Sequence, residues 1–370
     1  MTRATAAPSS FGYRMPAEWE PHEATWLAWP HNRSDWPGRF TPIPWVYAEI
    51  VRNLTVVERV HILVQSQAEE KNARRVLQKA GALNESVEFH RWPTNRVWTR
   101  DYGPIFVVKS KEERSPATLP AEIRKDPVAV VNFGFNAWAK YPDWKNDNKI
   151  PARVARSLKM VQFDAEVNGR SFVLEGGSID VNGRGTLITT EECLLSDVQQ
   201  RNPGLDREQI EQVLHDYLLV TNVLWLERGI VGDDTHGHVD DIARFVRPST
   251  VVAAVEGNQA DPNYEILQSN LSRLRASRDQ SGKQLTILEL PMPRPVVFSG
   301  QRLPASYANF YIANKLVLVP VFNDPNDRVA LNLMAEAMPD REIVPIYCGD
   351  FVWGLGTIHC ATQQQPATAV

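Results

Sequence analysis

One cysteine near the end of the chain has surroundings that suit a nucleophile. Cys360 closes the segment G-L-G-T-I-H-C, whose glycines Gly354 and Gly356 let a ligand come close to the backbone. A cysteine is more often a small buried hydrophobic residue than a reactive one. Another loop of the chain, however, supplies a histidine and carboxylates, which are the usual partners of a catalytic thiolate. We therefore predict that Cys360 is a nucleophile, and that Cys193 and Cys348, which lack such surroundings, are structural.

That second loop reads D-D-T-H-G-H-V-D-D and spans residues 233–241. His238 and Asp240 are two positions apart, so in an extended segment their side chains point the same way, with His236 one step further out. His359, the neighbour of the predicted nucleophile, would point to the opposite face if its stretch is a strand. The spacing therefore favours His238 over His359 as the general acid and base.

The same loop also allows a metal-dependent hydrolase. The spacing H-x-H-x-D of His236, His238 and Asp240 resembles the first ligand motif of some such enzymes. The further histidine expected there is absent, because position 241 is Asp241, and we predict no metal. The remaining histidines lie outside the polar loops and are predicted to be structural or solvated: His22, His31, His61, His90 and His215.

Two polar loops lie further upstream. They read W-T-R-D-Y-G-P at residues 98–104 and L-E-G-G-S-I-D at residues 174–180. Asp101 follows Arg100, and such a pair is as compatible with a structural ion pair as with function. Trp98 fits either a core position or a stacking face for a cationic ligand, which would contribute about 1 kcal/mol or more.

An internal repeat would position these loops. Three strand-like segments rich in β-branched residues begin at Leu187, Val251 and Leu316, which lie 64 and 65 positions apart. Each is followed by a polar turn, a helix-periodic stretch and another strand. The helices are expected at 46–57, 69–79, 208–218, 264–276 and 329–338, and further strands at 61–64, 86–90, 105–108, 128–133, 221–226, 284–290 and 343–347.

About five units of ββαβ type fit the chain, and none can bury its own apolar face, so the units must pack together. A closed ring leaves no exposed sheet edge and favours a five-bladed α/β propeller, with an ordinary α/β domain as the alternative. We expect an N-terminal tail at residues 1–14 and one catalytic domain at 15–366. In a ring the polar loops converge, and one pit would hold Asp101, Glu175, His238, Asp240, Asn309 and Cys360.

Composition argues against several classes of partner. Lys and Arg number 40 against 44 Asp and Glu, so the net charge of -4 gives no basic excess for nucleic acid. No apolar run is long enough to span a membrane, and the first ten residues lack the apolar core of a secretory signal. Three cysteines fit a reducing cytosol better than a disulfide framework, so we expect a cytoplasmic protein; a homo-oligomer is left open.

Tryptophan and proline cluster near the N-terminus. Residues 16–45 hold five of the 11 tryptophans and six of the 26 prolines. Such a segment resists long regular helices and predicts a packed, turn-rich surface or cleft wall. The part from Trp19 to Trp45 could form a lid over a small ligand.

Together these motifs resemble the agmatine deiminase family, which also contains the Porphyromonas-type peptidylarginine deiminases. The resemblance runs from about Met15 to Pro366 and includes T-E-E-C-L-L-S followed by R-N-P, G-D-D-T-x-G-H-V-D and G-x-I-H-C-x-T-Q-Q-Q-P. It implies the five-bladed α/β propeller (pentein-like) of guanidine-modifying enzymes, with catalysis that needs no cofactor.

The resemblance also implies catalytic roles. Cys360 aligns with the nucleophile and His238 with the general acid and base. Asp101 and Asp240 align with the carboxylates that hold the guanidinium group. Glu175 resembles the acid that orients the histidine.

Substrate contacts are expected from Trp98, Asp234, Asn309 and Gly356. The implied reaction converts agmatine to N-carbamoylputrescine and ammonia through an amidino-cysteine intermediate. The alternatives are a peptidylarginine or other small-guanidine deiminase on the same site, and a non-catalytic polyamine-binding protein.

The segment before the cysteine departs from the family. Agmatine deiminases usually read close to G-G-G-N-I-H-C, whereas this chain has Leu355 and Thr357. These two differences leave the exact substrate open, because they could change which substrate tail fits beside the cysteine. The nucleophile, histidine and carboxylates of the family pattern are all present.

Overall fold

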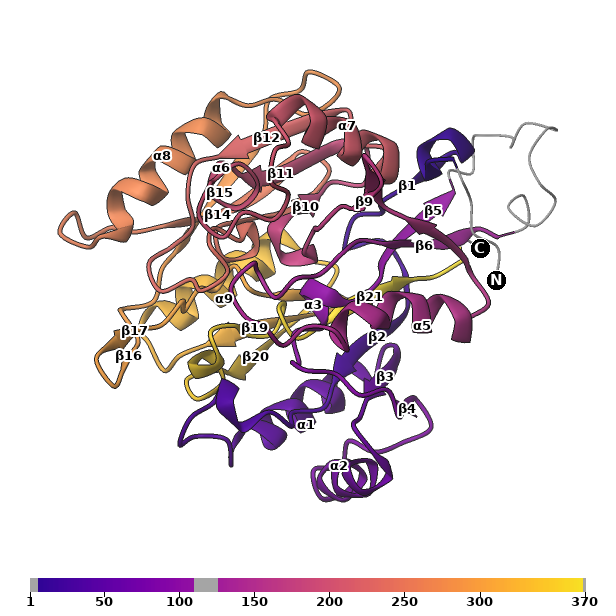
Figure 1. Cartoon of the computed structure of the whole chain (residues 1–370). Coiled ribbons are helices and arrows are strands. Elements are labelled where there is room, and N and C mark those ends of the chain that lie inside the picture. Colours follow the sequence, from indigo (N-terminus) through magenta and orange to yellow (C-terminus); the bar gives the residue numbers. More distant parts are fainter. Residues whose placement is uncertain (1–5, 110–125, 369–370) are drawn as a thin grey trace.

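The computed structural model of the protein describes residues 6–109 and 126–368 (Figure 1). Within these residues the strands form five sheets of three or four strands and two short hairpins. The first sheet has the order β1-β5-β6-β7: Tyr13–Arg14, Ile105–Lys109, Val128–Asn132 and Val161–Asp164. The second has the order β10-β11-β12: Asp180–Val181, Thr186–Thr190 and Asn222–Leu226.

The third and fourth sheets repeat this arrangement. The third consists of β13 (Ala243–Arg247), β14 (Thr250–Val255) and β15 (Thr286–Pro291). The fourth consists of β18 (Tyr311–Ala313), β19 (Leu316–Val321) and β20 (Glu342–Tyr347). The hairpins are β8 (Glu166–Val167) with β9 (Arg170–Ser171) and β16 (Val297–Phe298) with β17 (Gln301–Arg302).

Each of the first four sheets contains an antiparallel pair followed by a parallel pair. Parallel neighbours need a crossover connection, which a helix supplies here. These helices are α5 (Ile150–Ser157), α7 (Arg207–Leu218), α8 (Asn263–Ala276) and α9 (Asn326–Ala337). In the third sheet, for example, Leu267 and Leu271 of α8 pack with Val251 of β14 in one buried cluster. The predicted repeat of strands and helices is therefore confirmed.

The fifth sheet joins the two ends of the chain. Its order is β21 (Gln363–Pro366), β2 (His22–Ala28), β3 (Arg59–Leu63) and β4 (Val87–His90), with β21 antiparallel to β2. Helices α1 (Ile43–Leu54) and α2 (Gln67–Lys79) make its crossovers. Neither β2 nor β21 was predicted, since the Gln-Gln-Gln run of β21 has no apolar alternation. Its glutamines are buried because they hydrogen-bond, as Gln365 does with the Trp26 indole at 3.0 Å.

The tryptophan-rich segment is packed and contributes Ser34 and Asp35 to a cavity wall, as predicted, but most of it does not form the suggested lid. Trp26 lies in the buried strand β2, and Trp29 and Trp36 are also fully buried, so most of the segment is core and not a lid. Trp45 is 49% exposed. Burial removes the large apolar rings from water, so packing alone accounts for the clustering of these tryptophans. A lid is not needed to explain it.

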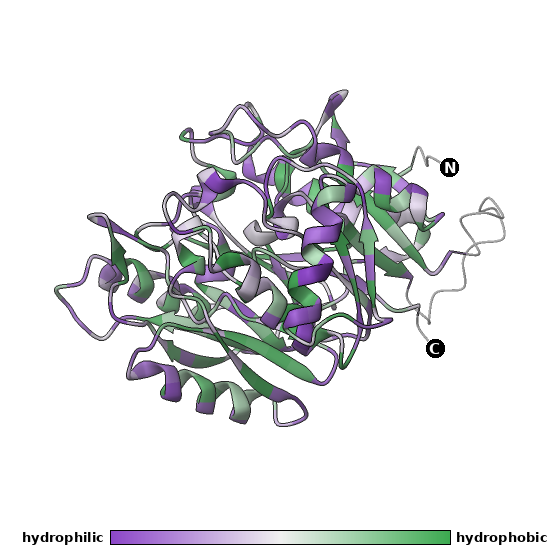
Figure 2. Ribbon diagram, turned by 90° about the horizontal axis from the view of Figure 1, so that it is seen from below, coloured by the Kyte–Doolittle hydropathy of each residue, from purple (hydrophilic) through white to green (hydrophobic). Residues whose placement is uncertain are grey.

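The predicted tail lies partly outside the described residues. Of the rest, Pro8–Phe11 forms the short helix η1, and Tyr13–Arg14 pairs with β5. Figure 2 shows hydrophobic residues concentrated on the strands and hydrophilic residues on helices and loops. Among the helices of residues 6–109 and 126–368, none is long and apolar enough to cross a bilayer.

Candidate active site

The structure brings the predicted pit residues together from five separate loops. Short helices hold three of the loops: α3 (Thr99–Tyr102), η4 (Gly176–Ser178) and η5 (Val239–Asp241). The other two precede β18 and β21. All six predicted side chains are buried, at 0–6% exposure: Asp101, Glu175, His238, Asp240, Asn309 and Cys360.

Gly177 marks the point where three of these side chains meet. A Cβ atom at this position would lie 2.6 Å from Nδ1 of His238, 2.8 Å from Oδ1 of Asp101 and 3.1 Å from Oδ2 of Asp240. A side chain at 177 would therefore displace the polar groups of the pit. This close approach explains the second glycine of the L-E-G-G motif.

The sulfur of Cys360 lies among polar groups. The Asn309 side-chain amide donates to Sγ at 3.1 Å, and Oδ2 of Asp240 lies 3.7 Å from Sγ. Burial, and then the carboxylates of Asp240, Asp241 and Asp101, raise the pKa of the Cys360 thiol well above its ordinary value. In the free protein the sulfur is thus a protonated thiol, and its ionisation requires a positive charge to enter the pit.

Asn309 is held in one orientation. Its Oδ1 accepts hydrogen bonds from the Thr357 hydroxyl at 2.8 Å and from the backbone N–H groups of His359 at 3.1 Å and Cys360 at 3.3 Å. This network directs the amide nitrogen toward the sulfur and Asp241. Thr357, one of the two departures from the family pattern, therefore supports the geometry of the nucleophile.

His238 is surrounded by acids. Its Nδ1 lies 3.7 Å from Oδ1 of Asp101, and its Nε2 lies 3.9 Å from Oε2 of Glu175. Burial alone would lower its pKa, but Asp101, the Cys193 side chain and Asp240 raise it well above 6.5. The imidazole is therefore protonated at neutral pH and able to act as an acid.

The two carboxylates closest to His238 have different environments. Asp101 accepts hydrogen bonds from Trp138 Nε1 at 2.9 Å and from the Gly177 backbone at 3.2 Å. Its burial, together with neighbouring carboxylates, raises its pKa to about 7. Glu175 instead accepts from Nε of Arg201 at 3.0 Å, an ion pair in which both side chains are inaccessible. Arg201 thus compensates the charge of Glu175.

His359 lies closer to the reaction centre than the sequence predicted. Residues 359–361 form a turn and not a strand, so His359 and Cys360 do not point to opposite faces. The His359 Nδ1 atom lies 2.7 Å from Oδ2 of Asp240, and its Nε2 lies 2.8 Å from Oε2 of Glu18. Glu18 also pairs with Arg244 at 2.9 Å. A buried polar chain therefore connects the N-terminal segment to the pit.

A small cavity of about 80 Å³ opens above Cys360. Trp98 lines the cavity, and a Cβ at Gly356 would lie 3.0 Å from both the Trp98 ring and the Cys360 Cβ, so a side chain there would crowd both residues. Leu355 also lines the cavity and has φ 68°, a left-handed conformation that favours glycine. Leu355 therefore adopts the backbone conformation that a glycine would favour at this position, although its side chain departs from the family pattern.

The mouth of the cavity carries paired charges. Asp234 accepts from Tyr141 at 2.6 Å and pairs with Lys140. Arg96 pairs with Asp35 and, at 3.0 Å, with Asp143. Oδ2 of Asp35 has no partner among the described residues, and burial raises the pKa of Asp35 to about 6.

The metal alternative is not supported by the geometry. His236 turns away from the pit, with its Nε2 3.1 Å from the Ser196 hydroxyl. Within residues 6–109 and 126–368, the groups with metal-ligand spacing are His61–Glu88–His90 and Glu175–Cys193–His238, and neither is the predicted set of His236, His238 and Asp240. Cys193, predicted to be structural, lies beside His238.

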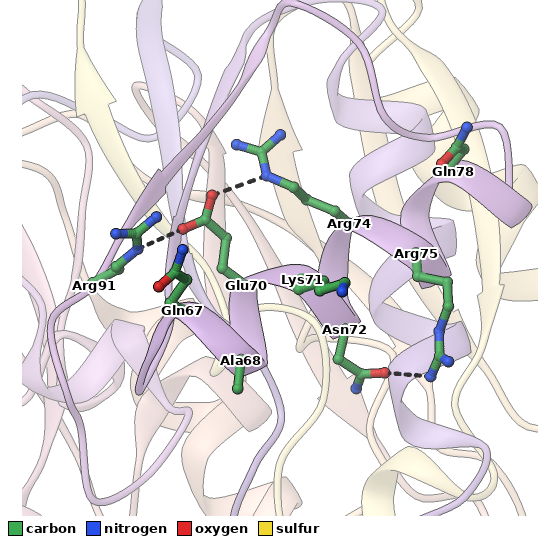
Figure 3. Close-up of a pocket in the computed structure, with 9 residues that line it drawn as sticks. All are labelled: Gln67, Ala68, Glu70, Lys71, Asn72, Arg74, Arg75, Gln78 and Arg91. Carbon is green, nitrogen blue, oxygen red and sulfur yellow. Dashed lines mark hydrogen bonds and ion pairs between the residues drawn. The ribbon is translucent and has the colours of Figure 1, made fainter.

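The large groove outside α2 lacks this chemistry. It encloses about 690 Å³ and is lined by residues of α2 together with Arg91. Figure 3 shows Arg74 and Arg91 both reaching Glu70, at 2.9 and 2.7 Å. Its lining contains no cysteine, histidine or buried carboxylate, so it offers no nucleophile or base.

Several contributors could not be found from sequence spacing. Glu18 meets His359 across more than 300 residues, and Arg201 meets Glu175 through a folded loop. Asp35 and Trp138 occur in segments without a glycine-rich polar motif. Their roles arise only from the packing of distant loops.

Comparison with known proteins identifies the family of the chain. The model of the family described as Porphyromonas-type peptidyl-arginine deiminase matches residues 14–366. The chain belongs to this family. It is 36% identical to the agmatine deiminase of Pseudomonas aeruginosa (strain LESB58), over 99% of each chain.

Solved structures of the family have the same fold. The agmatine deiminase of Enterococcus faecalis superimposes with a TM-score of 0.88 and 33% identity, covering all of both chains. A putative arginine deiminase from Porphyromonas gingivalis gives a TM-score of 0.81 and 32% identity, over 96% of this chain and 99% of that one. The family match includes both Glu18 and Cys360, so the whole polar chain of the pit lies within the peptidyl-arginine deiminase family region.

Proposed function

We propose that this protein hydrolyses agmatine to N-carbamoylputrescine and ammonia. The observation that carries the proposal is the convergence of Cys360, His238 and the carboxylates of Asp101 and Asp240 in one buried pit. Full-length relatives at 36% identity are agmatine deiminases, which supports the choice of substrate.

Substrate binding begins with the two aspartates. The planar guanidinium presents several N–H donors, and Asp101 and Asp240 grip it from two sides. Oδ1 of Asp240 has no partner among the described residues and is free to accept one of these hydrogen bonds. The cation offsets the buried negative charge, lowers the pKa of the Cys360 thiol and fixes the guanidinium carbon over the sulfur.

The first chemical step forms a covalent intermediate. As the guanidinium cation binds, the Cys360 thiol releases its proton to solvent, because His238 is already protonated. The thiolate then attacks the guanidinium carbon, and a C–S bond forms as the carbon becomes tetrahedral. His238 gives its proton to the departing nitrogen, the C–N bond breaks and ammonia leaves. The pKa of His238, raised by the surrounding acids, keeps this proton available at neutral pH.

The second step releases the product. Water attacks the amidino carbon while His238 takes one of its protons, and the C–S bond then breaks as the carbonyl forms. The second proton of the water is lost in this collapse and passes to the departing sulfur, which restores the Cys360 thiol of the free protein. The oxygen of water becomes the ureido oxygen of N-carbamoylputrescine. Every group in both steps belongs to the chain, the substrate or water, so no cofactor is required.

The tail of agmatine ends in an amine. A site that selects it should present acids or aromatic rings to that amine and no free arginine clamp. Asp35, with its unpartnered Oδ2, and Trp98 line the cavity, while Arg96 is already paired with Asp35 and Asp143. This arrangement supports agmatine over a substrate that carries a carboxylate at the same end.

The proposal includes the wider organisation of the chain. We infer that residues 15–366 form one catalytic domain whose five sheets are the blades of an α/β propeller, supported by their shared strand order. A reduced Cys360 is required for catalysis, which suits a cytoplasmic location.

The test is product analysis with a matched nucleophile variant. The wild-type protein should release ammonia and N-carbamoylputrescine from agmatine, and dialysis against a chelator should leave the initial rate unchanged. Acid-quenched turnover should show an amidino adduct on the peptide with Cys360. Cys360→Ser should bind agmatine without turnover, because a hydroxyl is far less ionised than a thiol. Full activity in Cys360→Ser would exclude the mechanism.

A further inference from the structure

Three potential metal ligands lie together on β3 and the edge strand β4 of the fifth sheet. His61 of β3 is in direct register with Glu88 of β4, and His90 follows Glu88 by two residues. Alternate residues of a strand share a face, so Glu88 and His90 point to the same side of the sheet as His61. This cluster contributes no atom to the pit around Cys360.

The three ligand atoms form a compact triangle. Nδ1 of His61 lies 2.9 Å from Nε2 of His90. Oε2 of Glu88 lies 3.6 Å from Nδ1 of His61, and the other carboxylate oxygen, Oε1, lies 3.6 Å from Nε2 of His90. Ligands at about 2.0–2.1 Å from a tetrahedral Zn²⁺ are separated by about 3.3 Å, so the two nitrogens must separate by a few tenths of an ångström and the exposed Glu88 carboxylate must turn one oxygen toward both.

The surroundings hold the two imidazoles in place. Trp26 stacks on His61 with ring centroids 4.2 Å apart, and Trp92 packs on His90 at 4.6 Å. The histidines are nearly buried, at 5% and 9% exposure, whereas the Glu88 side chain is 58% exposed. The rings are therefore preorganised, and the exposed carboxylate gives an ion a path from solvent.

The hydrogen bond between the two histidines sets the proton movement that metal binding needs. Nδ1 of His61 and Nε2 of His90 share one ring proton across their contact. A metal bound to both nitrogens requires this proton to shift to the other nitrogen of its ring, with no net loss of a proton from two neutral rings.

We propose that His61 Nδ1, His90 Nε2 and one carboxylate oxygen of Glu88 form a binding site for a divalent transition metal of the Zn²⁺ class, with water as the fourth ligand. The ion replaces the His61–His90 hydrogen bond and cross-links β3 to the edge strand β4. It stabilises the folded chain and takes no part in deimination. The site is independent of the proposed catalytic function.

The test uses Co²⁺ as a spectroscopic substitute for Zn²⁺, on protein without a polyhistidine tag. One equivalent of Co²⁺ should give the visible absorption of a tetrahedral ion with nitrogen and oxygen ligands. The near-ultraviolet band of cobalt bound to a thiolate should be absent from this signal, which separates the site from the Glu175–Cys193–His238 group. One equivalent of Zn²⁺ should displace the signal and raise the melting temperature of the protein.

Variants assign the ligands. His61→Asn and His90→Asn should remove the cobalt signal, and Glu88→Gln, at an exposed position, should weaken binding by about tenfold or more without affecting the fold. The matched control is His215→Asn, because His215 is an exposed histidine 3.3 Å from the Asp216 carboxylate but outside the cluster. Absence of the visible signal in wild-type protein, or its full retention in Glu88→Gln and His90→Asn, would overturn the proposal.

Discussion

Nδ1 of His359 lies 2.7 Å from the same oxygen of Asp240 that lies 3.7 Å from the sulfur of Cys360. The other ring nitrogen of His359 contacts Glu18, which two arginines, Arg100 and Arg244, also contact. Burial alone would raise the pKa of Asp240, but the hydrogen bond from His359 helps to hold it below its ordinary value. His359 therefore acts as a positioning residue that keeps Asp240 ionised beside the thiol.

Replacing His359 tests this role. His359→Gln keeps a hydrogen-bond donor but removes the imidazole that lowers the pKa of Asp240, so this pKa should rise. Asp101 already sets an acidic limb near pH 7, so protonation of Asp240 should add a second step, and kcat/KM at pH 5 should fall by about tenfold or more beyond the loss in the wild-type protein. Steady-state kinetics between pH 5 and 9 measures this steeper fall.

The control is His236→Gln. His236 belongs to the same polar loop as His238 but faces Ser196, so its replacement should leave the pH profile unchanged. An acidic limb in His359→Gln that is no steeper than in the wild-type protein would show that the contact with Asp240 is only structural.

Reactivity of the nucleophile should depend on the charge of the reagent. The Cys360 thiol is protonated in the free protein because burial and nearby carboxylates raise its pKa. A cationic reagent restores the missing positive charge, so chloroacetamidine should alkylate Cys360 faster than neutral chloroacetamide by about a hundredfold or more, beyond their intrinsic difference toward a small thiol. Peptide mass spectrometry gives both rates, with buried Cys348 as the unlabelled reference.

The preference for the cationic reagent should depend on the carboxylates of the pit. Asp101→Asn and Asp240→Asn each remove one negative charge, so the advantage of the cationic reagent should shrink in both variants. Equal labelling by the two reagents in the wild-type protein would contradict a role for substrate charge in forming the thiolate.

The pH dependence of substrate capture follows from Asp101. Burial raises its pKa to about 7 in the free protein, so the carboxyl group is neutral below that pH and ionised above it. Only the ionised form attracts a guanidinium, so kcat/KM for agmatine should rise as the pH increases from 5.5 to about 7.5. In the complex the bound cation lowers this pKa, so the corresponding limb of kcat should lie at lower pH. Identical limbs for kcat and kcat/KM would contradict this assignment.

The residues of the pit differ in how well the sequence alone could predict them. The repeated strands and helices were predictable because Leu187, Val251 and Leu316 begin apolar segments at nearly equal spacing. The pit was predictable because glycine-rich polar loops recur at matching places in these units. Packing brings Glu18 and Arg201 to the pit, and neither lies in a repeating pattern that marks it as functional.

Two segments near the C-terminus show that local sequence alone does not determine secondary structure. The segment of His359 was interpreted as extended, yet it forms a turn before β21. β21 itself has only polar residues before Pro366 and is recognisable only through its pairing with β2. In both cases, contacts between the two ends of the chain override the local pattern.

Recognition of the substrate amine should depend on Asp35. Asp35 lines the cavity, and its buried Oδ2 atom has no hydrogen-bond partner among the described residues; a bound ammonium group would supply one. Asp35→Asn should raise KM for agmatine by about tenfold or more, because a charged hydrogen bond is worth about 1.5–3 kcal/mol. The measurement compares agmatine with butylguanidine, which lacks the amine and should show little change. Equal losses for both compounds would mean that Asp35 supports only Arg96.

The most direct test of the central claim is kcat/KM measured by ammonia release from agmatine, free arginine, guanidinobutyrate and a blocked arginyl peptide. The small cavity above Cys360, the acids near its mouth and the pairing of Arg96 predict a preference for agmatine. Its kcat/KM should exceed that of the arginyl peptide by about a hundredfold or more, because the wrong polar end leaves buried groups unpaired. Comparable values for agmatine and the peptide would contradict an agmatine deiminase and favour a peptidylarginine deiminase at the same site.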